Sequence, residues 1–529
     1  MRSRMALVLL LVAVSCTAAG ERGGDPPSRA PEGFHPVAWA CRLPADQLLR
    51  IREGYRPGRS GEVQFVPRQP GYFGEHSHSG PWAYLQRVPL LFVRPPHVPE
   101  GVTVRRPVRL ADVAPTLARS LRFDLGDVDG RLLPEAIGRA AEPPRIVVTV
   151  VWDAAGMNVL REHPTAWPTL RSLRSRGTWF ARATVGSSPS VSPAIHGTLG
   201  TGMPPAEHGL VDMVFREGGE VVEVRDDPRH LLAPTLADRF DVIRGNRPIV
   251  ALLGHPLMVG LAGRGSAFPG GDRDLALVEA PDGWRAPGGP PVFRFPRYAS
   301  SDGGLDAAFG RLDRLDGEAD GAWRGEPLND LPPNGTPAWA EFHTRTATRV
   351  IRRERMGEDP MPDLLFLNYN QINEVGHRWS MNSGQMADTV RSTDRALGDL
   401  IGLLDRRVGR GRWLLVVTAD HGSTPDTSVS GAFVIDQAEL TRDLRNAFDH
   451  DRDGRSAIAQ VRVTQLWLDH AELAEGGFRP LDVAWFLARY TRADNRTTPN
   501  AMMPATRDER VFTSAFPGAV LREGCGEAS

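Results

Sequence analysis

Three runs of consecutive apolar residues constrain the fold of this chain more than any other feature. They occupy residues 146–153, 363–369 and 413–420, and the first and third end in aspartate. Uninterrupted runs rich in β-branched residues predict strands that are buried on both faces, as in a parallel sheet. Helical patterns separate the runs, the clearest over residues 386–408. This alternation predicts an α/β fold with a mostly parallel central sheet flanked by helices.

Shifts in composition divide the 529 residues into segments around this core. A stretch rich in Gly, Pro and Arg predicts a flexible tether, and one rich in Gly, Pro and Asp predicts an irregular insertion that caps the site. The expected segments are a signal peptide at 1–19, the tether at 20–40, short strands and a helix at 41–140, the α/β core at 141–430 with its inserted cap at 256–337, and a smaller C-terminal lobe at 431–529.

The first residues form a targeting segment. A positively charged start, MRSR, precedes an apolar run at residues 5–14 that is too short to cross a bilayer. The sequence VAVSC is similar to a bacterial lipobox in which Cys16 carries a lipid, although Ala13 stands where leucine is usual; cleavage after Ala19 is the alternative. Both readings export the protein. No later run reaches the roughly 18 apolar residues of a membrane span, so we expect membrane contact only through a lipid on Cys16.

Export permits disulfides, and the chain has three cysteines. If Cys16 is lipidated or removed, Cys41 and Cys525 remain near the two ends of the mature chain. Because domain termini are often close together, the two can form a disulfide; two free thiols are the alternative.

Charge excludes some partners and some chemistry. The formal net charge is −1, so no overall field attracts a nucleic-acid polymer or an anionic membrane. All 63 basic residues are arginine. No lysine can therefore act as a nucleophile or phosphate clamp, and that work falls to arginine, a metal ion or the backbone.

Polar residues at the ends of two apolar runs indicate a binding site. In open α/β sheets, ligands bind at the carboxyl ends of the strands. Asp153 ends one run, and Asp420 and His421 end another. A carboxylate next to an imidazole offers a metal ion one hard oxygen and one borderline nitrogen. A single aspartate at a strand end is more often a helix cap, but two such strands favour a metal site.

Two further stretches carry candidate residues. Residues 187–209 are crowded with hydroxyls and small residues and form either a Ser/Pro/Gly-rich loop or a helix opening, where the dipole favours phosphate. A serine placed on a metal ion loses its proton readily and becomes a nucleophile. Asn373 and His377 are four residues apart, so a helical turn places both on one face, where they can share an ion.

Four motifs together resemble the alkaline phosphatase superfamily, specifically its type I phosphodiesterase and nucleotide pyrophosphatase branch. In chain order they are VVWD, PSVSPAIHGTLGTGMPPAEHG, INEVGH and TADHG. The family's nucleophile block, PTxTxPNHxTLxTGxxPxxHG, matches residues 189–209 without a gap, with Ala194 and Ile195 at the family's Pro-Asn. The resemblance implies an alkaline-phosphatase-like fold, hydrolysis of phosphoester bonds in small substrates, and Ser192 as the nucleophile where the family more often has threonine. The residues indicate no particular oligomer.

One element of the family is displaced along this chain. The family carries a histidine ligand after TADHG, in a stretch like HGSPWxYDTHVPLLF, and neither His450 nor His470 has that context. The similar stretch SHSGPWAYLQRVPLLF occupies residues 77–92, with His78 as the best-placed ligand. We infer a circular permutation in which residues 41–140 supply the C-terminal part of the catalytic fold.

The resemblance also implies a two-metal mechanism. The two divalent ions, usually zinc, would lie about 4 Å apart. One ion would be held by Asp153, Ser192, Asp420 and His421, and the other by His78, His377 and Asn373. Ser192 would displace the leaving group in line, and water would then cleave the phospho-serine.

Two departures from the family pattern leave an alternative open. The family has aspartate where this chain has Asn373, whose neutral amide binds a dication less strongly. It also has an asparagine 21 residues after the nucleophile, where Met213 cannot donate a hydrogen bond. An apolar side chain there tilts the preference slightly from phosphomonoesters toward phosphodiesters. The alternative function is a catalytically weakened surface lipoprotein that retains the fold as a binding module.

A second type of metal site has a weaker pattern. The sequence DHDRDG, from Asp449 to Gly454, has aspartate at positions 1, 3 and 5 and glycine at position 6 of a calcium loop, but position 12 is Gln460 instead of glutamate. The alternatives are a calcium site and a solvated acidic turn.

Overall fold

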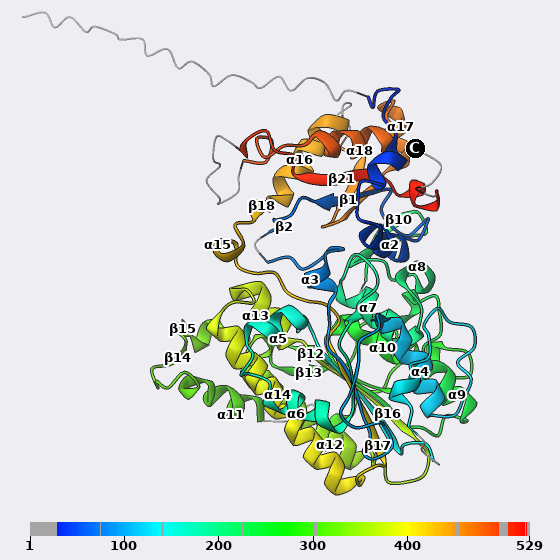
Figure 1. Ribbon diagram of the computed structural model, residues 1–529, viewed down its shortest axis with the longest axis vertical. Coiled ribbons are helices and arrows are strands. Elements are labelled where there is room, and N and C mark those ends of the chain that lie inside the picture. The colour runs from blue at the N-terminus through cyan, green and yellow to red at the C-terminus, as the bar shows by residue number, and fades with distance from the viewer. Residues whose placement is uncertain are drawn as a thin grey trace, which may run out of the picture.

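The larger of two lobes contains a mostly parallel sheet (Figure 1). The computed structural model describes residues 29–74, 76–138, 142–224, 226–299, 304–449, 454–496, 506–523 and 525. The expected signal peptide, with Cys16, lies outside these residues. Within the described ranges, no helix is long and apolar enough to cross a membrane.

Among the described residues, the central sheet has nine strands in the order β13-β12-β11-β16-β6-β17-β3-β7-β4. In that order the strands are Gly283–Arg285, Leu275–Ala280, Val250–Gly254, Asp363–Tyr369, Ile146–Trp152, Trp413–Thr418, Leu90–Val93, Thr178–Phe180 and Val102–Val104. The five from β12 to β17 run parallel, and β13 and β3 flank them as antiparallel neighbours. The three apolar runs form β16, β6 and β17, and every residue in these strands is buried. The predicted α/β fold is confirmed.

Helices cover both faces of this sheet (Figure 1). On one face α12 (Pro337–Arg353) packs against α14 (Gly384–Arg407), and on the other lie α4 (Val113–Ser120), α7 (Ser192–Thr201) and α9 (Leu236–Ile243). The sequence of α14 explains its orientation, because its buried residues recur every three or four positions and therefore share one face. These include Met386, Val390, Thr393, Leu397, Leu400 and Leu404.

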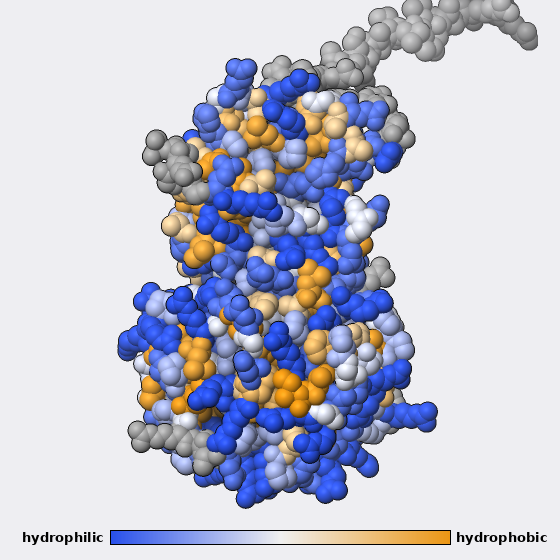
Figure 2. Space-filling view, turned by 90° about the vertical axis from the view of Figure 1, so that its right-hand side faces the viewer, coloured by the Kyte–Doolittle hydropathy of each residue, from blue (hydrophilic) through white to orange (hydrophobic). Residues whose placement is uncertain are grey.

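The smaller lobe is built from both ends of the chain. Its largest described sheet has four strands in the order β19-β20-β1-β21, which are Ile458–Val461, Gln465–Leu468, Val63–Pro67 and Phe512–Pro517. Helix α18 (Pro480–Arg489) packs on this sheet. Figure 2 shows a narrower waist between this lobe and the larger one.

The N-terminal part of the smaller lobe differs from the expected boundaries. Phe34, Trp39 and Phe65 share an apolar core with Leu466 and Leu487. The first part of the expected catalytic segment therefore belongs to the smaller lobe, and helix α1 (Pro36–Ala40) lies inside the expected tether. A short helix of five residues has too little periodicity to be recognised from sequence, and burial of Trp39 holds it in place.

The rest of that segment extends the central sheet. β3 pairs antiparallel with β17, and β4 pairs parallel with β7 at the edge of the sheet. An N-terminal segment thus lies beside the strand that precedes Asp420 and His421, which is the geometry that the permutation hypothesis requires.

The expected irregular insertion at 256–337 differs in its middle. Leu275–Ala280 and Gly283–Arg285 form β12 and β13 at one edge of the central sheet. The run LALVEA is short, and the Gly- and Pro-rich segments around it are typical of loops. The sequence pattern therefore did not predict a strand there. β11 pairs with β12 along four residues, so backbone hydrogen bonding adds to burial in fixing this strand.

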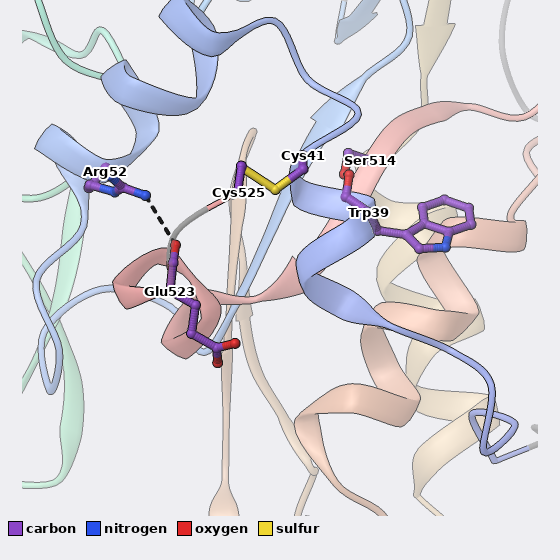
Figure 3. The surroundings of a disulfide bond; sticks show 6 residues. All are labelled: Trp39, Cys41, Arg52, Ser514, Glu523 and Cys525. Carbon is purple, nitrogen blue, oxygen red and sulfur yellow. Dashed lines mark hydrogen bonds between the residues drawn. A yellow bond between two sulfur atoms is a disulfide. The ribbon is translucent and has the colours of Figure 1, made fainter. Parts of the chain in front are cut away.

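A disulfide between Cys41 and Cys525 closes the smaller lobe (Figure 3). Of the two alternatives that the sequence left open, the structure has the disulfide. Next to it, the Ser514 hydroxyl donates to the Trp39 carbonyl, and Arg52 donates to the Glu523 carbonyl. These contacts join the first helices of the described chain to its last residues.

Removing this disulfide should destabilise the smaller lobe. Replacing both Cys41 and Cys525 with serine frees the two ends of the unfolded chain, and we expect the free energy of unfolding to fall by about 2–4 kcal/mol. Urea unfolding followed by tryptophan fluorescence measures the change, with reduced wild type as the matched control. An unchanged unfolding curve would show that the lobe is closed by its packing alone.

Candidate metal and catalytic site

The strands of the central sheet bring polar side chains together at their carboxyl ends. Asp153 follows β6, Asp420 and His421 follow β17, and Asn368 lies near the end of β16, the neighbour of β6. The backbone turns sharply here, since Ala154 has a φ of 62°, in the left-handed region that residues other than glycine seldom adopt. Its N–H donates to Asp420 Oδ1 at 3.1 Å.

Asp153, Asp420 and His421 form a buried cluster of metal-ligand type. One ligand atom from each of the three lies within 4.8 Å of the others. His421 Nε2 is 3.5 Å from Asp153 Oδ1 and 3.5 Å from Asp420 Oδ2, and all three side chains are fully buried. Asn368 Nδ2 donates to the other oxygen of Asp153 at 2.9 Å. The carboxylates are thereby fixed with one oxygen each directed at the imidazole.

The two carboxylates repel each other strongly, because both are buried and water does not screen their charges. Burial, and then the charge of Asp420, raise the pKa of Asp153 well above its usual range. Burial also opposes ionisation of Asp420, but His421, His196 and the Ala154 N–H outweigh it and lower the pKa of Asp420. A cation between two such carboxylates removes the repulsion and stabilises both in the charged form.

Helix α7 directs its first turn toward the same edge. Ser192 is its first residue and is 8% exposed, and Pro193 next to it suits a helix start. His196 lies one turn further along the same face, with Nε2 3.6 Å from Asp420 Oδ2 and 3.4 Å from Asn368 Nδ2. The face that carries Ser192 and His196 therefore points toward the carboxylate cluster.

Two imidazoles from distant segments meet beside His421. His78, from the loop after β2 (Gly71–Phe73), has its Nε2 3.2 Å from the Nε2 of His377, on α13 (Gln371–Trp379). The ring of His78 also stacks on that of His421, with centroids 3.8 Å apart. Two nitrogens about 2.1 Å from one tetrahedral zinc ion are about 3.4 Å apart, so this spacing fits a shared ion.

Both of these imidazoles favour the neutral form. Burial, then His421 and His377, lower the pKa of His78 well below its usual range. Burial, then His421, lower the pKa of His377 to about 4, although His377 keeps one exposed face. Neutral imidazole is the form that binds metal ions.

The third predicted member of this second set, Asn373, lies one helical turn before His377 on α13. Its Oδ1 is buried without a hydrogen-bond partner. The neighbouring Glu374 accepts a hydrogen bond from Asn370 at 3.1 Å. That bond holds Glu374 within its own helical turn.

Unpaired ligand atoms test whether these residues suit metal ions. Buried polar atoms normally have partners, yet four ligand atoms of the two sets have no hydrogen-bond partner among the described residues. They are Asp153 Oδ1, Asp420 Oδ2, His421 Nε2 and Asn373 Oδ1. A mixture of carboxylate, amide and imidazole donors suits a divalent transition metal or zinc, so the donor set fits.

Three residues near the site were not predicted from the sequence. Asn368 and His196 contact the carboxylates, and His255 follows β11 with its N–H donating to Asn368 Oδ1 at 3.3 Å. Asn368 and His255 could have been identified from their position at the end of a strand. His196 could have been identified from its spacing of four residues from Ser192. The second histidine of the same block, His208, is structural, because it bonds the Thr198 hydroxyl and the Leu210 N–H.

The expected calcium loop from Asp449 to Gly454 lies mostly outside the described residues. The Asp449 carboxylate itself accepts hydrogen bonds from the Ser456 hydroxyl and the Ala457 N–H.

Comparison with known proteins identifies relatives of this chain. A model of the family "Type I phosphodiesterase / nucleotide pyrophosphatase" matches residues 147–477. Alkaline phosphatase PafA of Elizabethkingia meningoseptica is 28% identical over 190 residues, which are 34% of this chain and 33% of that protein. Alkaline phosphatase PhoV of Synechococcus elongatus is 35% identical over 92 residues, which are 17% of this chain and 16% of that protein. These matches span a third or less of each relative.

A solved structure shares the fold. A crystal structure of alkaline phosphatase PafA with four substitutions aligns with a TM-score of 0.51 and 18% identity, over 69% of this chain and 79% of that one. At this identity the likeness concerns the fold, and it agrees with the central sheet and helical layers described above.

The hydrogen bond from Asn368 should set metal affinity. Replacing Asn368 with alanine leaves Asp153 free to rotate, and we expect affinity for zinc to fall about 10–100-fold. Competition with a fluorescent chelator measures it. The control is Asn446→Ala, at an exposed position of α16 (Gln437–Phe448). Equal zinc affinities of the Asn368→Ala variant and wild type would show that Asn368 does not contribute to metal binding.

Proposed function

The chain belongs to the type I phosphodiesterase / nucleotide pyrophosphatase family, and we propose that it hydrolyses phosphoester bonds of small substrates through a phospho-serine at Ser192. The observation that carries this proposal is the convergence of unpaired buried ligand atoms at the carboxyl edge of the sheet, beside the first turn of α7. Buried polar atoms in a purely structural cluster normally have hydrogen-bond partners, whereas a metal site leaves its ligand atoms free for the ion.

We assign the ligands to two ions, with zinc the metal that their chemistry favours. Asp153, Ser192, Asp420 and His421 would hold one, and His78, His377 and Asn373 the other. Bound divalent ions lower the pKa of a coordinated hydroxyl and withdraw charge from phosphoryl oxygens. Since an amide oxygen binds a dication less strongly than a carboxylate, the set with Asn373 is the weaker of the two.

Ser192 then provides the nucleophile for the first step. Its Oγ gives up its proton to water and attacks phosphorus, an Oγ–P bond forms, and the bond from phosphorus to the leaving oxygen breaks on the opposite side. The leaving oxygen takes up a proton from water. The N-terminus of α7 favours the negative charge of the phosphoryl group. Asn368 keeps Asp153 oriented, and His196 lies close enough to Asp420 to stabilise its charge.

The second step restores the serine. A water molecule attacks phosphorus of the phospho-serine, a new P–O bond forms, and the Oγ–P bond breaks. Ser192 Oγ takes up a proton, and the phosphorylated product leaves. The neutral imidazoles of His78 and His377 lie on the side of His421 where this water can enter, because His377 keeps an exposed face.

The charge around the site supports a diester as the preferred substrate. A monoester carries an additional negative charge that needs a further cation. Arg285, whose charge acts on His255, is paired with Asp226 at 2.7 Å. Met213 packs against the apolar core, and Asp212 beside it accepts a hydrogen bond from Gln465 of the smaller lobe at 2.9 Å. Neither Met213 nor Asp212 therefore offers a hydrogen-bond donor to a phosphoryl oxygen of the substrate.

We also propose that the protein works outside the cytoplasm. The Cys41–Cys525 disulfide supports this, because disulfides persist in oxidising compartments. An N-terminal lipid on Cys16 would then hold it at the membrane surface.

Loss of the Ser192 hydroxyl should abolish turnover. In Ser192→Ala we expect kcat for a p-nitrophenyl ester to fall at least about 1,000-fold, with metal content unchanged or reduced by one ion. Ser187→Ala, a buried hydroxyl on the same loop, is the matched control and should keep its activity. Substantial turnover by Ser192→Ala would assign the nucleophile to water instead.

The two ester classes should differ in rate. For metal-replete protein we expect kcat/KM for a p-nitrophenyl phosphodiester to exceed that for p-nitrophenyl phosphate by at least about tenfold, because Arg285 is already paired with Asp226 and does not meet the second charge of the monoester. Paired assays at one pH and one metal concentration decide it. Faster hydrolysis of the monoester would mean that Arg285 leaves Asp226 when substrate binds.

A further inference from the structure

Three carboxylates gather near the amino end of β12, whereas the candidate active site lies at the carboxyl ends of the central strands. Asp241 is in the last turn of α9, and Asp272 and Asp274 precede β12. One oxygen from each lies within 4.8 Å of the others. Because β12 runs parallel to β16 and β6, its start is a strand length of about 15–20 Å from the edge that carries Asp153.

Two of these carboxylates are buried without compensation. Asp241 is 3% exposed and Asp274 is 7% exposed. Among the described residues, no donor forms a hydrogen bond with either carboxylate, and Asp241 Oδ1 is fully buried and unpartnered. No arginine or histidine in the described chain forms an ion pair with the three. Burial of unpaired carboxylates is strongly unfavourable, so the cluster requires a cation or protons.

The surroundings add to this negative charge. Asp241 lies at the C-terminal end of α9, where the helix dipole disfavours an anion. Asp238, in the same helix, is already satisfied by the N–H groups of Thr235 and Arg264. Arg294 is committed to Glu354 at 2.8 Å. Burial, then the charges of Asp241 and Asp272, raise the pKa of Asp274 to about 9.

We propose that Asp241, Asp272 and Asp274 bind one calcium ion that joins α9 to the start of β12. Oxygen-only ligands favour a hard cation over zinc. Oxygens on opposite sides of a calcium ion are about 4.6–5.2 Å apart, and the three carboxylate oxygens lie within that span. Asp272 is exposed, which leaves an opening for water ligands and for entry of the ion.

This ion has a structural task. β12 and β13 form the edge of the sheet, and residues 255–274 connect β12 to β11 without a long helix. The α9 end and the connection already touch through the hydrogen bond from Asn246 Nδ2 to the Gly270 carbonyl at 3.0 Å. A calcium ion at the three carboxylates fixes the same junction and removes their repulsion.

Calcium content tests the proposal directly. The probe is calcium chloride added to zinc-saturated protein, followed by gel filtration and elemental analysis. We expect Asp274→Asn to bind one calcium ion fewer per chain than wild type. The control variants are Asp420→Asn, in the candidate active site, and Asp449→Asn, in the acidic turn. Both should keep the calcium ion that is bound at this cluster. Equal calcium content in Asp274→Asn and wild type would overturn the proposal.

Thermal stability gives a second readout with opposite signs. Calcium should raise the Tm of wild type by about 3–6 °C over its value in a calcium-selective chelator, and should leave Asp274→Asn unchanged. In the chelator, Asp274→Asn should melt no lower than wild type, since it loses a buried charge. Asp272→Asn, at an exposed position, should keep the fold and show a reduced shift. An equal calcium shift in all three proteins would place the ion elsewhere.

Discussion

Two fully buried carboxylates, Asp153 and Asp420, set the requirements that the rest of this structure meets. Each follows a central strand, and each has one oxygen without a hydrogen-bond partner. Charges so far from water are tolerated only with compensating partners. Asn368, the Ala154 N–H and His196 supply part of this compensation. The oxygens that remain face His421, and a bound cation would balance their charge, as the proposed function requires.

The candidate site depends on a segment in the N-terminal part of the chain. The family match covers residues 147–477, whereas His78 lies before that range. β3 carries this N-terminal segment alongside β17, and the stacking of His78 on His421 joins the two halves of the site. The smaller lobe also uses both ends of the chain and is closed by the Cys41–Cys525 disulfide. A segment that precedes the family match in sequence thus lies beside that match in space.

Much of the fold could be predicted because its signals are local. The runs that form β6, β16 and β17 are mostly apolar, and Asp153, Asp420 and His421 follow the ends of two of them. His78 was found only through the resemblance of its surroundings to a family stretch, since a lone histidine in a polar loop has no pattern. β12 was not predicted, because it lies among turn residues. β1 was expected as a strand, but of the catalytic fold, whereas it pairs with strands about 400 residues later in the smaller lobe. Pairing over such distances leaves no periodic trace in the sequence.

Zinc-edge anomalous diffraction from crystals of zinc-loaded protein locates any bound ions. We expect one peak among Asp153, Asp420 and His421, next to Ser192, and a second peak between His78 and His377. A weaker second peak would agree with the amide of Asn373 in place of a carboxylate. Absence of a peak among the two carboxylates and His421, with zinc bound elsewhere, would contradict the assignment of this edge of the sheet as the active site.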